Sequence, residues 1–352
     1  MARTGRRIWV RIAPAAVVSM VAAGLAGGLA PASAAGATAS YTSYSNIEYV
    51  AGGTSEQNLD LYVPTGSDRA RPLIIFVHGG GWSGGGKNEL DQTNKQAFLD
   101  AGFAIASVNY TLSGTAKFPQ QIYDLKAAIR YLRANAREYG LDGSIGLWGH
   151  SAGGQLVALA GTSCGVRLLE GNEGNRQASS CVQAVVDGYG PTDFLQMDTH
   201  LTVPGAGLHD PASSAESQYL GCTSGLLACP VSTVEAANPI TYITASLRQG
   251  DRGDRDNRLP AFLIAHGDAD TAVPIWESQI LYTALSHACD DVSFYTLHGI
   301  GHVFFLNFVN ALNPPYPSST LVKSDHCSPT RTTESTTLTW QTLVGFFHTH
   351  LR

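Results

Sequence analysis

A serine between closely spaced glycines is the first feature of this sequence that could do chemistry. In the stretch LWGHSAGGQL, residues 147–156, Ser151 lies between Gly149 and Gly153 in a G-x-S-x-G pattern. An apolar run precedes the stretch and a helical pattern follows it, which is the context of a nucleophile elbow, a tight strand-to-helix turn that lifts the serine Oγ out of the sheet. We therefore predict that Ser151 is a nucleophile if the rest of the chain supplies its partners.

A glycine-rich stretch after an earlier apolar run could stabilise the negative charge that such a nucleophile creates. HGGGW, residues 78–82, follows LIIFV and leaves backbone N–H groups free to approach a developing oxyanion. We assign Gly80 and Gly81 to this oxyanion hole, together with the N–H of Ala152. The loop continues to Lys87 in a G-x-x-x-x-G-K pattern, but the next residue is Asn instead of the Ser or Thr that binds magnesium, which argues against a nucleotide site.

A serine nucleophile also needs a histidine base and a carboxylate that orients it, in the chain order serine, acid, histidine. HGDADTAVP, after the apolar run AFLIA, offers Asp268 and Asp270. LHGIGH, after VSFYT, offers His298 and His302. We choose Asp270 because it lies further into its loop, and His302 because two glycines would let it swing over Ser151. Asp268 is expected to stabilise its own turn, and His298 still lies at its strand end.

Three side chains beside these motifs are candidates for substrate contact. Trp82 ends HGGGW, Tyr110 closes an apolar run together with Asn109, and His150 adjoins the nucleophile. Alternation along a strand would point His150 away from the substrate side, and His266 is expected to pack at a strand end. Asn109 and Tyr110 could line a pocket or could be ordinary strand-end residues.

Apolar runs that alternate with helical patterns predict the scaffold for these residues. Six runs are typical of strands buried on both faces: RPLIIFVHGGG, FAIASVNY, SIGLWGH, VQAVVDGYG, AFLIAHGDAD and VSFYTLHG. Residues 118–140 between them carry apolar side chains at helical spacing. We predict an α/β domain with a mostly parallel central sheet flanked by helices. Residues 191–258 break this rhythm and are expected to form a small cap excursion from the sheet.

The first 34 residues predict export. Four arginines precede an Ala/Val/Leu-rich run and the A-x-A pattern at Ala32–Ala34, as in a secretory signal peptide. A permanent membrane anchor is the alternative, and the pair Arg6-Arg7 leaves Sec and twin-arginine export open. We expect a flexible lead over residues 35–45 and one catalytic domain over residues 46–352, secreted and without membrane contact after cleavage of the signal.

Six cysteines follow the signal segment, and an even number in an exported chain favours disulfides over a metal site. About fifteen pairings are formally possible. Sequence proximity suggests Cys164 with Cys181, Cys222 with Cys229, and Cys289 with Cys327.

Charge and composition exclude other classes of partner. The net charge is −6, and no basic run with interleaved aromatic residues is present, which argues against nucleic acid. The stretch RQGDRGDRDNRLP mixes carboxylates with arginines and is more typical of a solvated turn than of a calcium loop. We expect no metal and no cofactor. Hydrophobic residues make up 44% of the chain, enough for one large buried core.

Several motifs in a fixed order resemble a known family. HGGGW, GHSAGG, YGPTDF, AESQYLGC, NPITYI, FLIAHGDADTAVP and GIGH, between about Asn58 and His302, resemble the α/β-hydrolase esterases of the bacterial feruloyl and acetyl-xylan esterase group, relatives of the hormone-sensitive-lipase-like enzymes. The resemblance implies the α/β-hydrolase fold, with Ser151 as nucleophile, Asp270 as acid and His302 as base. The sequence departs from this resemblance in two places. Thr111 follows Asn-Tyr where such enzymes commonly have arginine, and the insertion NFVNALNPPYPSSTLVKSDHC after His302 is longer than usual. Both could alter the mouth of the pocket.

The expected function is that of an exported, cofactor-free serine hydrolase of carboxylic esters. The resemblance favours acetyl or feruloyl esters of plant polysaccharide as substrates. A general short-chain carboxylesterase or a lipase is the alternative, although residues 191–230 are too polar to favour an apolar lid. A non-catalytic binding module with the same fold is the alternative from another class, and it would leave every one of these motifs idle.

Overall fold

The computed structural model describes residues 38–243, 259–288, 290–302, 316–325 and 331–351, and the chain from Thr38 onward forms one compact unit. Its parallel strands are β3 (Arg71–Val77), β4 (Ala104–Val108), β5 (Leu141–His150), β6 (Ala184–Gly188), β7 (Ala261–Gly267) and β8 (Val292–Leu297). These strands coincide with the six predicted apolar runs. Every residue of β4, β6 and β7 is buried, as expected for strands covered on both faces.

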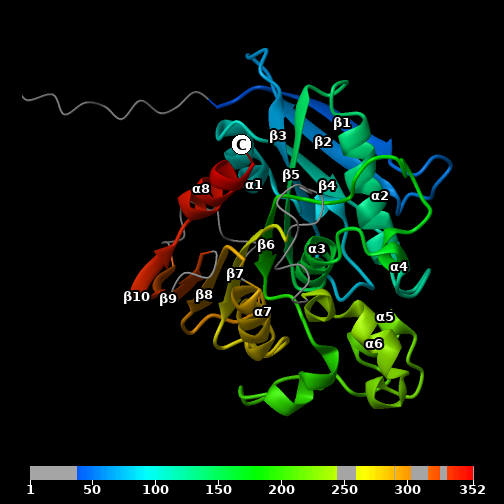
Figure 1. Ribbon diagram of the computed structural model, residues 1–352, viewed down its shortest axis with the longest axis vertical. Helices are drawn as coiled ribbons and strands as arrows, with labels where there is room; N and C mark the ends of the chain where they lie inside the picture. Colours follow the sequence, from blue (N-terminus) through cyan, green and yellow to red (C-terminus); the bar gives the residue numbers. More distant parts are fainter. Residues whose placement is uncertain (1–37, 244–258, 289, 303–315, 326–330, 352) are drawn as a thin grey trace, which may run out of the picture. The chain divides into compact units, whose positions relative to one another are not determined.

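Antiparallel strands extend this sheet on both sides: β1 (Tyr41–Glu48), β2 (Asn58–Pro64), β9 (Tyr316–Ser324) and β10 (Arg331–Leu338). The strand order in the described chain is β1-β2-β4-β3-β5-β6-β7-β8-β9-β10 (Figure 1). This architecture confirms the predicted α/β fold with a mostly parallel sheet. The expected flexible lead over residues 35–45 is wrong from Tyr41 onward, because this Tyr/Ser/Thr-rich segment pairs with β2.

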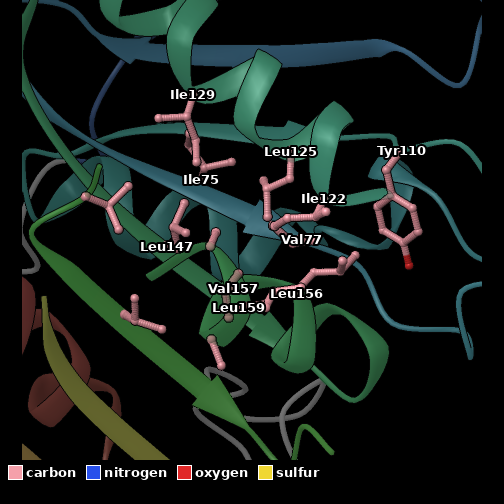
Figure 2. Close-up of a cluster of buried hydrophobic side chains, with 14 of the residues drawn as sticks. Ile75, Val77, Tyr110, Ile122, Leu125, Ile129, Leu147, Leu156, Val157 and Leu159 are labelled. Carbon is pink, nitrogen blue, oxygen red and sulfur yellow. The ribbon is translucent and has the colours of Figure 1, made fainter. Parts of the chain in front are cut away.

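Helices cover both faces of the sheet. On one face, α1 (Gln92–Asp100) and α8 (Trp340–His350) enclose an aromatic cluster with Phe98, Trp148 and Phe347. On the other face lie α2 (Gln120–Ala134), α3 (Ala152–Thr162) and α7 (Trp276–His287). Figure 2 shows the larger core on this face, where side chains of α2 and α3 pack on those of β3 and β5. The central strands are therefore held rigidly, and their carboxyl ends are fixed supports for loops.

A long excursion follows β6. Residues 191–243, which we call the cap segment, contain two helices and four short 3₁₀ turns: α5 (Ala215–Leu220), α6 (Val231–Ala237), η2 (Phe194–Gln196), η3 (Asp198–His200), η4 (Leu226–Ala228) and η5 (Pro239–Tyr242). Two further short elements lie outside it, η1 (Lys87–Glu89) and α4 (Arg167–Glu170). The charged stretch that was weighed as a calcium loop lies almost wholly outside the described residues.

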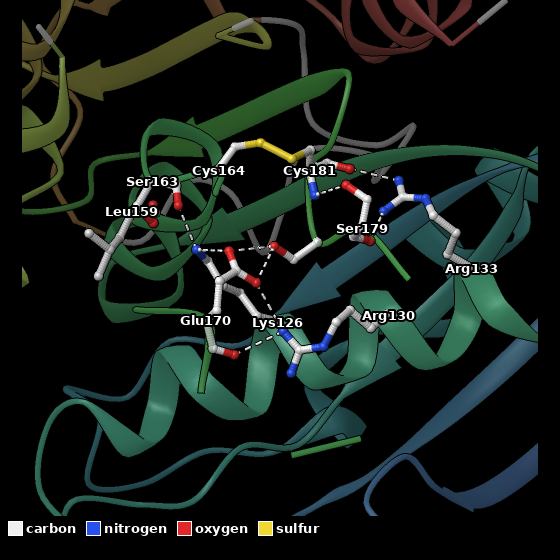
Figure 3. Close-up of a disulfide and its surroundings, with 10 residues drawn as sticks. Lys126, Arg130, Arg133, Leu159, Ser163, Cys164, Glu170, Ser179 and Cys181 are labelled. Atoms are coloured by element: carbon white, nitrogen blue, oxygen red, sulfur yellow. Dashed lines mark hydrogen bonds and ion pairs between the residues drawn. A yellow bond between two sulfur atoms is a disulfide. The ribbon is translucent and has the colours of Figure 1, made fainter. Parts of the chain in front are cut away.

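Two of the three suggested disulfides are present. Cys164 pairs with Cys181 and Cys222 pairs with Cys229, whereas Cys289 and Cys327 lie outside the described residues. The first disulfide closes the end of α3 onto the segment before β6, beside a buried polar network (Figure 3). In that network Lys126 donates to Glu170 at 2.8 Å and to the carbonyl of Ser163 at 2.6 Å. Within the described part of the chain, no helix is long and apolar enough to cross a membrane.

Candidate active site

The turn between β5 and α3 has the geometry of a nucleophile elbow. Ser151 adopts φ 54° and ψ −125°, a region that side chains rarely occupy. A Cβ on Gly149 would lie 2.3 Å from the carbonyl oxygen of Gly153, and a Cβ on Gly153 would lie 2.3 Å from that of Val77. Glycine is therefore required at both positions. The Ser151 N–H donates to the carbonyl of Gly188 at 2.8 Å, which ties the turn to β6.

A continuous chain of hydrogen bonds joins the three residues that the sequence selected. His302 Nε2 lies 2.9 Å from Ser151 Oγ, and His302 Nδ1 lies 2.8 Å from Asp270 Oδ2. The Asp270 side chain is fully buried, and the His302 side chain is 23% exposed. These residues follow β5, β7 and β8 respectively, so the carboxyl end of the parallel sheet brings them together.

Asp270 is held in its ionised form. Its Oδ1 accepts from the backbone N–H groups of Ala272 at 2.8 Å and Val273 at 3.0 Å. Burial would raise its pKa, but hydrogen bonds from His266 and His302 outweigh burial and hold the pKa of Asp270 well below its usual range. An ionised Asp270 requires a proton on His302 Nδ1, which leaves Nε2 as the acceptor for the Ser151 hydroxyl.

The residues that the sequence analysis set aside form a separate pair. His298 Nδ1 lies 2.8 Å from Asp268 Oδ2, and His298 Nε2 lies 2.9 Å from Thr320 Oγ1. Asp268 also accepts from the N–H of Gly299 at 2.6 Å. Both side chains are exposed, and neither has a contact with Ser151. Asp268 thus holds its own turn to the loop after β8.

The glycine loop after β3 packs directly against the elbow. A Cβ on Gly79 would lie 2.9 Å from the His150 ring. Gly80 turns the chain with φ 90°, and its carbonyl accepts from the N–H groups of Ser83 and Gly84 at 3.1 Å each. The N–H groups of Gly80, Gly81 and Ala152 make no hydrogen bond to any described residue. These three donors therefore have no partner within the described part of the chain.

The three candidates for substrate contact are instead buried supports. Trp82 is 1% exposed, stacks on Tyr219 with ring centroids 4.4 Å apart, and donates from Nε1 to Gln155 Oε1 at 3.0 Å. Tyr110 is also 1% exposed and donates to the carbonyl of Gly79 at 3.0 Å. The assignment of both residues to substrate binding is wrong, because burial leaves no surface for a ligand.

His150 is likewise a support. Its side chain is buried between Phe76 and Tyr189, with Nε2 3.6 Å from Glu89 Oε2. Its assignment to substrate binding is therefore wrong, and the alternation of side chains along β5 accounts for its direction. Asn109 is a support as well, because its Oδ1 accepts from the N–H of Lys87 at 2.7 Å. The Lys87 ammonium forms an ion pair with Asp60 and donates a hydrogen bond to Asn46 Oδ1.

Two residues of the site escaped the sequence analysis. Tyr189, directly after β6, is buried with φ 45°, and its ring lies 4.5 Å from that of His302. Gln155 lies one helical turn after Ser151 and bridges Trp82 to the cap segment, where its Nε2 donates to the carbonyl of Ala237 at 2.7 Å. A buried glutamine at position i+4 from the nucleophile was the available signal for this bridge.

The cap segment borders the site on two sides. A Cβ on Gly81 would lie 3.3 Å from Ala215 Cβ at the start of α5. The N–H of Gly207 donates to the carbonyl of Thr271 at 3.1 Å, next to Asp270. The cap segment therefore contacts both the glycine loop and the loop of the acid.

Several proteins that are similar to this chain are named as esterases. Esterase LipQ of Mycobacterium tuberculosis is 29% identical over 272 residues, which is 74% of this chain and 57% of LipQ. Esterase LipC of the same organism is 27% identical over 67% of this chain and 53% of LipC. This chain thus spans about half the length of the curated relatives that it matches.

A solved structure described as a truncated carbohydrate esterase from gut microbiota is 34% identical, with a TM-score of 0.65 over 75% of this chain and 90% of that one. A bifunctional GH43-CE protein of Bacteroides eggerthii is 35% identical, with a TM-score of 0.62 over 75% of this chain and 36% of that one. The family model BD-FAE matches residues 59–285. Because that match covers more than half of this chain, the chain belongs to the BD-FAE family of α/β-hydrolase esterases.

Proposed function

We propose that this protein hydrolyses carboxylic esters through an acyl-enzyme on Ser151. His302 Nε2 takes the proton of the Ser151 hydroxyl as Oγ attacks the ester carbonyl carbon, and the carbonyl oxygen becomes an oxyanion. When the bond to the leaving alkoxide breaks, His302 gives that proton to the alkoxide. Water then attacks the acyl-enzyme, its proton passes through His302 to Ser151 Oγ, and the acid is released. Asp270 stays ionised and stabilises the imidazolium.

The observation that carries this proposal is the chain of hydrogen bonds from Ser151 through His302 to the buried Asp270, with distances of 2.9 and 2.8 Å. The N–H groups of Gly80, Gly81 and Ala152 serve as the oxyanion hole, and loss of one such donor costs about 3 kcal/mol of transition-state stabilisation. A non-catalytic module would not need a strained serine aligned with a histidine base.

The proposed substrates are acetyl or feruloyl esters attached to polysaccharide. A solved structure with 34% identity is described as a carbohydrate esterase, and one with 35% identity as a bifunctional GH43-CE protein, which supports this substrate class. We also propose that the protein is secreted. The basic and apolar first 34 residues support export, and two disulfides suit an oxidising compartment.

A general short-chain carboxylesterase is the second candidate. Carboxylesterase NlhH of Mycobacterium tuberculosis is 38% identical over 89 residues, and the longer curated matches are named esterases without a carbohydrate substrate. The two candidates share the same reaction and differ in the alcohol that leaves.

The proposal is tested by hydrolysis of p-nitrophenyl esters from C2 to C12, with methyl ferulate and acetylated xylan in parallel. Release of acetate from acetylated xylan, or of ferulate from methyl ferulate, would support the polysaccharide assignment if Ser151→Ala abolishes it. Activity on short p-nitrophenyl esters alone would favour the general carboxylesterase. A fluorophosphonate probe separates both from a binding module, because an adduct at Ser151 requires an activated serine, and its absence in folded protein would refute ester hydrolysis at this site.

A further inference from the structure

Asp270 contacts a second histidine in addition to His302. His266 is fully buried at the end of β7, and its Nε2 lies 3.3 Å from Asp270 Oδ2, the oxygen that also accepts from His302. The same Nε2 lies 3.0 Å from the carbonyl oxygen of Val273. The other ring nitrogen, Nδ1, lies 2.8 Å from Ser278 Oγ in α7. Both nitrogens of this buried ring therefore have polar partners.

The protonation of His266 follows from these partners. A backbone carbonyl can only accept a hydrogen bond, and the ionised Asp270 carboxylate can only accept, so His266 Nε2 must carry a proton. That N–H is shared between Val273 and Asp270. The neutral ring then has an unprotonated Nδ1, which accepts from the Ser278 hydroxyl. The Val273 carbonyl and the Asp270 carboxylate thus select the tautomer in which His266 donates toward the acid, and Ser278 supplies the donor for the other ring nitrogen.

We propose that His266 is a positioning residue for the ester hydrolysis described above, and that Ser278 holds the His266 ring in its orientation by donating to Nδ1. His266 acts through Asp270, because its N–H fixes the direction of the carboxylate whose Oδ2 orients the His302 ring. The polar chain of the site is therefore longer than three residues and runs from Ser278 through His266, Asp270 and His302 to Ser151. This inference rests on the proposed function.

This series of hydrogen bonds from Ser278 to Ser151 predicts different effects for substitutions at His266 and Ser278. His266→Leu removes the N–H, and we expect kcat to fall by about tenfold or more, the effect of one hydrogen bond to a charged group, with little change in KM. Asp270 then has fewer donors and pairs more strongly with a protonated His302, so the acid limb of the kcat/KM profile should move to higher pH. Glutamine can supply an N–H from its Nε2, and His266→Gln should restore part of kcat.

Ser278→Ala keeps the ring and removes only the hydroxyl that contacts Nδ1. The His266 ring is then held by its Nε2 contacts alone, so its N–H is less precisely directed at Asp270. We expect a fall in kcat of about threefold to tenfold, with the acid limb moved in the same direction. Matched controls lie at the far end of α7, where His287 is exposed and Ser286 is half-buried. His287→Leu and Ser286→Ala should leave kcat and the profile unchanged.

The experiment measures kcat, KM and the pH profile with p-nitrophenyl acetate for the full chain and each variant, and then adds His266→Leu to an Asp270→Asn background. An effect of His266→Leu that vanishes in that background supports action through the acid. Equal losses in both backgrounds, or a lower kcat with an unmoved acid limb in both His266→Leu and Ser278→Ala, would overturn the inference and leave a packing role. If wild type and Ser151→Ala hydrolyse the ester equally slowly, it is the proposed function that has failed.

Discussion

A Cβ on Gly267 would lie 2.0 Å from the carbonyl oxygen of Ile300. This contact joins the loop that carries the acid to the loop that carries the base, because Asp270 comes three residues after Gly267 and His302 comes two residues after Ile300. The N–H of Ala269 donates to the same carbonyl at 3.1 Å. Backbone packing therefore helps to set the distance between Asp270 and His302, in addition to the hydrogen bond between their side chains.

Gly267→Ala should separate the acid from the base. The new methyl group cannot fit against Ile300, so the loop of His302 must move, and a shift of about 1 Å costs on the order of a hundredfold in kcat/KM. The matched control is Gly301→Ala, whose Cβ would lie 3.7 Å from the nearest atom, an ordinary contact. The measurement is kcat/KM for p-nitrophenyl acetate alongside thermal unfolding. Similar kcat/KM values for the two folded variants would contradict this account of the loops.

Ser151→Gly should abolish activity and stabilise the protein. Serine at φ 54° and ψ −125° is strained by about 1–3 kcal/mol, whereas glycine adopts this conformation readily. Glycine also costs up to about 1 kcal/mol through the entropy of the unfolded chain, so the net gain should be about 1 kcal/mol. Ser151→Ala keeps the Cβ and should show no such gain. Equal melting temperatures for the two variants would mean that the elbow stores little strain.

The central strands could be predicted from the sequence, and candidate site residues could be proposed from it, because their signals are local. Strands buried on both faces are continuous apolar runs, and the elbow and glycine loop have fixed spacings. Asp270 could be separated from Asp268 because its place in the loop decides which carboxylate reaches His302. β1 was missed because its residues are mostly polar and its stability depends on pairing with β2.

The roles of Trp82, Tyr110 and His150 could not be read from sequence position. Trp82 and His150 adjoin functional motifs and Tyr110 follows a central strand, but the direction of each side chain depends on the elements that pack against it. Trp82 turns inward because α3 supplies Gln155 as an acceptor, and Tyr110 turns inward because the carbonyl of Gly79 is within reach. These partners lie 73 and 31 residues away along the chain, outside any local pattern.

Loss of the Cys164–Cys181 disulfide should destabilise the protein more than loss of Cys222–Cys229. The two bridges close segments with sequence separations of 17 and 7 residues. In the chain-entropy model these loops correspond to about 3 and about 2.4 kcal/mol. Double Cys→Ser variants compared by urea unfolding measure the difference. A larger loss for the shorter loop would show that contacts of the cap segment, and not loop entropy, determine the effect.

We expect the free energy of unfolding to depend on pH through Asp187. It is fully buried at the end of β6, where Oδ1 accepts from the N–H of Gly190 at 3.0 Å and Oδ2 has no partner among the described residues. Burial, offset only in part by the hydrogen bond from Gly190, raises the pKa of Asp187 to about 7. Between pH 4 and pH 7 the folded state therefore keeps a proton that the unfolded state has lost, so the free energy of unfolding must decrease as the pH rises.

Asp187→Asn should remove this contribution. Each pH unit between about 4 and 7 costs wild type about 1.4 kcal/mol through this residue, and the loss stops once the folded state is also ionised. Asparagine keeps an acceptor for Gly190 and carries no charge, so the variant should gain stability relative to wild type as the pH rises. Urea unfolding at pH 5, 6, 7 and 8 measures this difference, with the exposed Asp68→Asn as control. Parallel curves for wild type and Asp187→Asn would mean that burial does not raise the pKa of Asp187, and that its carboxylate is ionised throughout this pH range.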